Sequence, residues 1–160
     1  MVKVHITPKE ADLRVERAVQ LFKEGYNCSQ SVVGAFADLY GFTQEQALLM
    51  SASFGGGIGR MRQTCGAACG MFVLAGLQSG TTIGSDREGK SRNYAMVQQL
   101  AESFKQIIGS MICAELLGLK SNAEITAQAS ERTDSYYKKR PCSEMVRTAA
   151  RLFANAISQD

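Results

Sequence analysis

The 160-residue sequence lacks the long apolar, low-complexity and charged runs that mark membrane, disordered and nucleic-acid-binding proteins. No stretch approaches the roughly 18 consecutive apolar residues of a membrane-spanning helix, so we expect no membrane insertion. Apolar residues make up 45% of the chain without any long polar tract, which favours one folded domain over residues 1–160. The net charge of +3 is small and the basic residues are scattered, so we expect no nucleic-acid partner.

A secretory leader is also missing. Residues 1–10 have neither an apolar core nor a small-residue cleavage site, so we expect a cytoplasmic protein. Structural disulfides are rare in the reducing cytoplasm. The five cysteines of this chain therefore indicate a metal site or redox chemistry rather than structural crosslinks.

No segment alternates apolar and polar residues in the manner of a β-strand, whereas helical spacing recurs along the chain. We therefore predict an all-α, single-domain helical bundle of about six to seven helices. Cap residues and apolar spacing predict helices over residues 8–24, 28–40, 44–54, 65–77, 86–108, 111–117 and 141–157. The polar stretch between the last two predicts a short helix near 123–130, followed by an exposed loop rich in tyrosine and basic residues.

A glycine-rich loop, Gly55–Gly59, precedes the predicted central helix, which is apolar enough to be buried. The loop has neither the G-x-G-x-x-G nor the Walker pattern, so nucleotide binding has little support. Glycine instead lets the backbone pass close to a neighbouring site and offer N–H groups to sulfur or to an anionic ligand. Arg60 and Arg62 either stabilise a thiolate or belong to a solvated basic loop. The candidate cofactor-binding residues here are Gly56, Gly57 and Arg60.

Four of the five cysteines fall in the first turn of four different predicted helices: Cys28, Cys65, Cys113 and Cys142. A helix N-terminus presents unpaired N–H groups and the positive end of the helix dipole, which stabilise a thiolate and lower the pKa of a cysteine. If these helix starts meet at one end of the bundle, they form a pocket for four thiolates. The alternative is that each cysteine packs as a small buried hydrophobe, which is what we expect of Cys69.

The spacing of the cysteines along the chain narrows the chemistry that they can carry out. Zinc fingers bring their ligands in close C-x2-4-C pairs, whereas these four cysteines lie far apart, so structural zinc is disfavoured. The thioredoxin C-x-x-C and haem C-x-x-C-H motifs are absent. Two chemistries remain open: an iron–sulfur or other thiolate-bound metal centre held by all four cysteines, or reversible thiol/disulfide pairs.

The segment CGAACG at residues 65–70, with Cys28 upstream and Cys113 and Cys142 downstream, resembles the C_GCAxxG_C_C family of redox-active proteins. The four defining cysteines of that family correspond to the four at the predicted helix starts, and Cys69 occupies a variable position. The resemblance extends over about residues 14–156. Further segments that resemble the family are GYNCSQS at 25–31, FGGG at 54–57, CAELLG at 113–118 and PC at 141–142.

The resemblance implies redox activity without a settled substrate or reaction. Members are often encoded near transporter genes, which suggests a transporter as a partner, and related domains resemble part of cytochromes that hold haem and an iron–sulfur centre. We therefore predict a redox-active protein, either an oxidoreductase or an electron-transfer protein, with an unknown redox partner and with homo-oligomer formation left open. The alternative is a non-catalytic helical binding module with packed cysteines that acts with a transporter.

Overall fold

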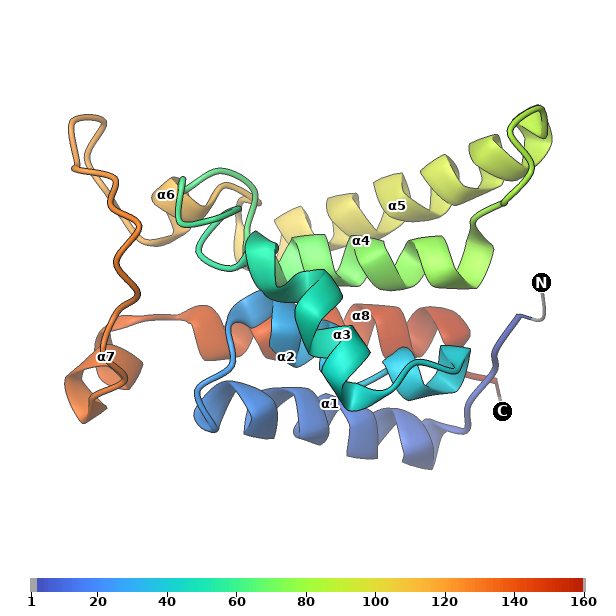
Figure 1. Ribbon diagram of the computed structural model, residues 1–160, viewed down its shortest axis with the longest axis horizontal. Coiled ribbons are helices and arrows are strands. Elements are labelled where there is room, and N and C mark those ends of the chain that lie inside the picture. The colour runs from blue at the N-terminus through green and yellow to red at the C-terminus, as the bar shows by residue number, and fades with distance from the viewer. Residues whose placement is uncertain (1–2, 160) are drawn as a thin grey trace.

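The computed structural model describes residues 3–159, which form α-helices joined by loops and short 3-10 turns (Figure 1). The α-helices are α1 Pro8–Lys23, α2 Cys28–Gly34, α3 Gln44–Ser51, α4 Gly66–Ser79, α5 Arg87–Ile108, α6 Cys113–Leu116, α7 Asp134–Lys139 and α8 Cys142–Ile157. The 3-10 helices are η1 Ala37–Tyr40 and η2 Ala52–Phe54. Residues 3–159 contain no β-strand, and the predicted all-α bundle is confirmed. None of these helices is both long and apolar enough to cross a membrane.

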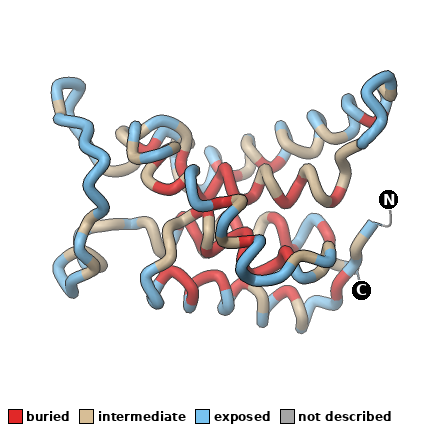
Figure 2. Tube along the Cα trace, viewed as in Figure 1, coloured by how far each residue is buried: buried red, intermediate tan, exposed pale blue. Residues whose placement is uncertain are grey.

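The helices stack in layers, with α1 on one side, α2 and α8 in the middle, and α4 and α5 on the other side (Figure 1). Helix α8 packs against α1, α4 and α5, while α2 packs against α1, α3 and α4. Buried residues gather where these helices face one another, and the connection between α6 and α7 is largely exposed (Figure 2). The bulkiest side chains of this core are the fully buried Phe22, Phe36, Phe104 and Phe153.

Side-chain caps set where the first helices begin, as the sequence predicts. The Thr7 hydroxyl accepts a hydrogen bond from the Glu10 N–H at the start of α1. Asn27 and Gln30 form a reciprocal capping box at the start of α2. This cap fixes Cys28 as the first residue of α2, so a local interaction places one cysteine of the predicted site.

Several predicted helix boundaries are wrong, those of α2 and α5 among them. Helix α2 ends at Gly34, because glycine disfavours continuation, and the chain goes on as η1. Helix α5 begins at Arg87, one residue after its predicted start. Its cap is Asp86, whose carboxylate accepts a hydrogen bond from the Gly89 N–H. The residues near 123–130 form no helix; the helix of this segment is α7, which begins where the Thr133 hydroxyl accepts from the Tyr136 N–H.

The first half of α4 is built from small residues, and this lets its backbone approach neighbouring backbone directly. A Cβ atom on Gly66 would lie 2.7 Å from the carbonyl oxygen of Phe54 and 3.3 Å from the Cα atom of Gly55. A Cβ atom on Gly76, in the same helix, would meet nothing within 4 Å. The two glycines therefore serve different purposes, and only Gly66 is required for packing.

We expect alanine to have opposite effects at these two positions. Gly66→Ala should lower the free energy of unfolding by about 1–3 kcal/mol, because the added methyl group overpacks the helix start. Gly76→Ala should raise it by about 0.5–1 kcal/mol, because alanine favours a helix where space is free. Urea unfolding monitored by circular dichroism measures both values. If Gly66→Ala instead raised the free energy of unfolding, the added Cβ atom could not lie as close as 2.7 Å to the Phe54 carbonyl oxygen.

Candidate functional site

Four helix starts meet at the end of the bundle that lies away from the two chain ends (Figure 1). Cys28, Cys113 and Cys142 are the first residues of α2, α6 and α8, and Cys65 caps the start of α4. All four line one cavity of about 60 Å³, which is enough space for a few water molecules. The structure thus brings the four cysteines to one place, while their chemical roles remain a prediction.

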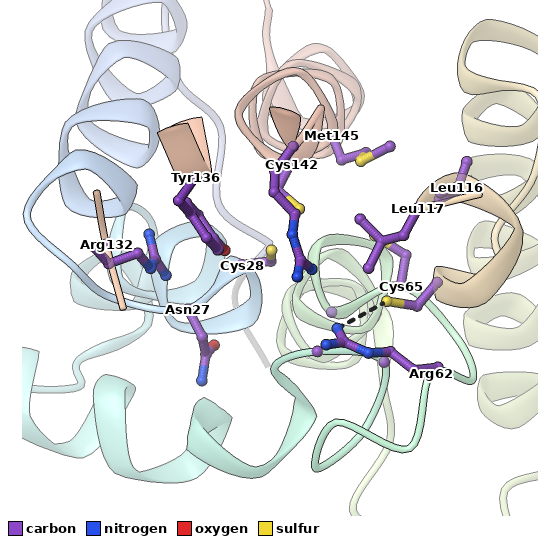
Figure 3. A pocket seen from close by; sticks show the side chains of 15 residues that line it. Asn27, Cys28, Arg62, Cys65, Leu116, Leu117, Arg132, Tyr136, Cys142 and Met145 are labelled. Carbon is purple, nitrogen blue, oxygen red and sulfur yellow. Dashed lines mark hydrogen bonds between the residues drawn. The ribbon is translucent and has the colours of Figure 1, made fainter. Parts of the chain in front are cut away.

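The thiols of Cys28 and Cys142 are neighbours in this cavity, and each strongly influences the other (Figure 3). Hydrogen bonding from the Cys28 thiol is the largest effect on Cys142 and lowers its pKa to about 7, against the opposing effect of burial. The same interaction, together with burial, raises the pKa of Cys28 well above its ordinary value. The interaction therefore favours a thiolate on Cys142 over one on Cys28, and a pKa of about 7 leaves Cys142 partly ionised at neutral pH.

Three arginines surround the Cys142 sulfur and further lower its pKa: Arg140, Arg132 and Arg62. Arg132 is held firmly, because its guanidinium donates to the carbonyl oxygens of Phe22 at 3.1 Å and Tyr26 at 2.9 Å. Its charge also lies 4.4 Å from the centre of the Phe22 ring. These carbonyls lie in the last turn of α1 and in the connection to α2, so Arg132 joins the segment before α7 to the core beside the cysteines.

Cys65 and Cys113 are held next to each other by backbone hydrogen bonds between their two segments. The Cys65 N–H donates to the Met111 carbonyl, and the Cys113 N–H donates to the Gln63 carbonyl, each at 2.6 Å. Gly57 lies against this pair: a Cβ atom there would be 2.6 Å from the Cβ atom of Cys113. A side chain at Gly57 would therefore displace Cys113 from the cavity.

Burial, rather than the helix dipole, dominates at these two cysteines. Burial raises the pKa of Cys65 to about 12, although the N–H groups of Ala68 and Ala67 oppose the shift. Burial likewise raises the pKa of Cys113, against the effect of the Arg62 guanidinium, whose Nη1 lies 3.8 Å from the Cys113 sulfur. The prediction that a helix start lowers the pKa of each cysteine is therefore wrong for Cys65 and Cys113, because loss of water outweighs the dipole. It is also wrong for Cys28, where the hydrogen bond with Cys142 and then burial raise the pKa.

The glycine-rich loop runs through left-handed backbone, with positive φ at every residue from Gly56 to Arg60 and again at Arg62. Gly56 and Gly57 line the cysteine cavity, as does Arg62. Arg60 instead faces a neighbouring cleft, where its guanidinium donates to the carbonyl oxygens of Thr126 and Gln128. The cofactor-binding role of Gly56, Gly57 and Arg60 stays a prediction.

One comparison with known proteins bears on this arrangement. A family model described as "Putative redox-active protein (C_GCAxxG_C_C)" matches residues 26–156, which include all five cysteines. The chain belongs to the C_GCAxxG_C_C family. No curated protein and no solved structure matches the chain. Membership supports redox activity and leaves open whether a metal or the thiols carry it.

The four cysteines that match the C_GCAxxG_C_C pattern do not form a metal site as they are placed. Among residues 3–159, no three side chains of cysteine, histidine, aspartate or glutamate are positioned to hold one metal ion. An iron–sulfur cluster with four thiolate ligands needs all four sulfurs around a common centre. The residues present therefore do not fit such a centre in this arrangement.

Cys69 lies apart from the other four C_GCAxxG_C_C positions. It is buried on α4 outside the cavity, and its thiol is 3.8 Å from the carbonyl oxygen of Thr64. Burial raises its pKa to about 11. This placement agrees with the expected core packing, and nothing near Cys69 favours the thiolate strongly enough to overcome burial.

Several residues that line the cavity carry no signal of this role in the sequence. Tyr136 and Arg140 belong to the stretch predicted as an exposed loop, but that prediction is wrong, because α7 folds back and half-buries Tyr136 against the core. Arg132 has no motif around it. Met145 likewise lies outside the short segments that resemble the family, whereas Asn27, Leu116 and Leu117 fall inside them without being predicted as site residues.

We expect Cys142 to be the first cysteine to react with iodoacetamide, because only thiolates are alkylated rapidly. Its rate should rise with pH around a midpoint near 7, whereas Cys65 and Cys69 react only at higher pH. Cys28→Ala should move the midpoint of Cys142 upward, since it removes the thiol donor. Peptide-resolved mass spectrometry measures each rate.

Cys28→Ser is the matched control, because a hydroxyl can still donate to the Cys142 sulfur. In this variant, the pH midpoint of Cys142 alkylation should stay closer to that of the unaltered protein. Equal midpoints in the unaltered protein and in Cys28→Ala would contradict the assigned interaction between the two thiols.

Proposed function

We propose that the protein carries out thiol–disulfide exchange, with Cys142 as the attacking thiolate and Cys28 as the second thiol. The observation that carries this proposal is the contact between a low-pKa sulfur and a high-pKa sulfur in one cavity. An attacking thiol is most effective when its pKa is near the ambient pH, and the pKa of Cys142 is about 7. Membership of a family described as redox-active supports the same class of function.

The reaction balances without any further cofactor. The Cys142 thiolate attacks one sulfur of a partner disulfide, the S–S bond breaks, and the first partner thiolate leaves. Cys28 then gives its proton to that thiolate and attacks the Cys142 sulfur, which releases the second partner thiolate and forms a Cys28–Cys142 disulfide. The two cysteines lose two electrons and the partner disulfide gains them; a partner thiol pair reverses the reaction.

Cys65 and Cys113 supply a second pair of thiols in the same cavity. Both are protonated near neutral pH, because burial raises the pKa of each. Neither is poised to attack first.

Equilibration with a low-molecular-weight disulfide should produce a Cys28–Cys142 disulfide in the unaltered protein. Cys28→Ser should stop at a mixed disulfide on Cys142, because no second thiol is in contact to release the partner. Cys69→Ser should behave like the unaltered protein, since Cys69 lies outside the cavity. Non-reducing peptide mapping by mass spectrometry identifies these products.

Two results would overturn the proposal. One is the recovery of all five thiols unchanged after the disulfide treatment. The other is an anaerobically purified protein that is coloured and contains iron and sulfide, which would indicate that the cysteines rearrange around a cluster instead of exchanging disulfides.

A further inference from the structure

A larger cleft opens beside the cysteine cavity. It has a volume of about 430 Å³, within the range of small-molecule sites, and is formed by the glycine-rich loop, the start of α2 and residues 127–140. The cleft lies directly beside the cysteine cavity, because the two hollows share part of their walls. The shared residues are Asn27, Gly56, Arg62, Arg132, Tyr136 and Arg140.

The cleft is lined by four arginines and by no acidic residue: Arg60, Arg62, Arg132 and Arg140. None of them forms an ion pair among residues 3–159. The ion pairs in that part of the chain involve Arg14, Arg92, Arg147 and Arg151, which lie on α1, α5 and α8. Four positive charges therefore face one hollow without a carboxylate to balance them.

Neutral groups hold these arginines in position. The Arg60 guanidinium donates to the Thr126 carbonyl oxygen at 3.0 Å and to the Ser130 hydroxyl at 3.3 Å. The Arg140 guanidinium lies 5.3 Å from the centre of the Tyr136 ring. Such partners orient a guanidinium and leave its charge available to a ligand.

The backbone bears strain at two of these positions. Arg60 and Arg62 both have φ of +61°, a left-handed conformation that costs about 1–2 kcal/mol for a residue with a side chain. Burial and then the like charges of Arg62 and Arg140 lower the pKa of Arg60. The fold therefore keeps these charges together at a cost in backbone strain and in mutual repulsion. An anionic ligand would relieve the repulsion.

We infer that this cleft binds a small anionic disulfide, one that carries carboxylates, and presents its S–S bond to the cysteine cavity. The inference rests on the thiol–disulfide exchange proposed above. The arginines pair with the carboxylates, for which the planar guanidinium is well matched, while the sulfurs reach Cys142. The same positive charges stabilise the two thiolates that leave, so the cleft favours both binding and the departure of the product.

Binding is tested first with S-methylglutathione, which carries carboxylates but has no disulfide and cannot react. Titration calorimetry should detect binding that weakens as salt is added. Arg60→Gln and Arg140→Gln should each weaken it about tenfold or more, the usual effect of losing a charged hydrogen bond. Arg92→Gln, which removes the same charge from the exposed face of α5, should change nothing. Arg132 is left intact because it also supports the end of α1.

The reaction is tested with three disulfides of different charge: anionic glutathione disulfide, neutral hydroxyethyl disulfide and cationic cystamine. Formation of the Cys28–Cys142 disulfide should be fastest with the anionic compound and slowest with the cationic one, by about tenfold or more. Arg60→Gln and added salt should reduce this difference.

The outcomes separate the two proposals. If S-methylglutathione does not bind and the three disulfides react alike, the anionic cleft is overturned while the thiol exchange stands. If none of the three oxidises Cys28 and Cys142, the exchange itself fails, and with it the assignment of a disulfide as ligand, even where the unreactive analogue binds.

Discussion

The approach of the α4 backbone to its neighbours is the constraint on which the cysteine cavity depends. Gly66 starts α4 where any side chain would collide with the Phe54 carbonyl, and its added Cβ would also touch Cys28 at 3.4 Å. A Cβ atom on Gly70, one turn later, would lie 3.0 Å from the carbonyl oxygen of Ser29 in α2. Because two helix starts come together backbone to backbone, the sulfurs they carry share one cavity. Larger residues here would separate α2 from α4 and divide the site.

The four cysteines share a position at helix starts, but their surroundings differ, and the surroundings decide their chemistry. A helix dipole acts within about one turn and contributes a modest free energy. Burial opposes the thiolate at Cys65 and Cys113 more strongly than the dipole favours it. Cys142 alone combines a thiol donor with several nearby guanidinium groups. Cys142 is therefore the one of the four whose pKa is lowered, and the proposed order of attack follows from that difference.

The glycine-rich loop links the thiols to the proposed binding cleft. Gly57 leaves the space in which Cys113 sits, while Arg62 lies between the cavity and the cleft and donates toward the Cys113 sulfur. The α7 segment closes the other side through Arg132, which is held by carbonyls at the end of α1. Residues distant in the chain thus bring arginine side chains and cysteine sulfurs together at the end of the helical bundle. The cavity and the cleft lie there side by side.

The all-α class, most helix starts and the presence of a cysteine at four of them follow from the sequence, because caps and helical spacing are local properties. The start of α2 shows this best, since the Asn27 and Gln30 capping box lies within four residues of the chain. The difference in pKa among the cysteines and the gathering of the arginines come from the tertiary structure. Those properties depend on burial and on contacts such as Arg132 with Phe22, which lie 110 residues apart in the chain and leave no local pattern. The short helix near 123–130 was mispredicted because its replacement, α7, is anchored by packing against the core.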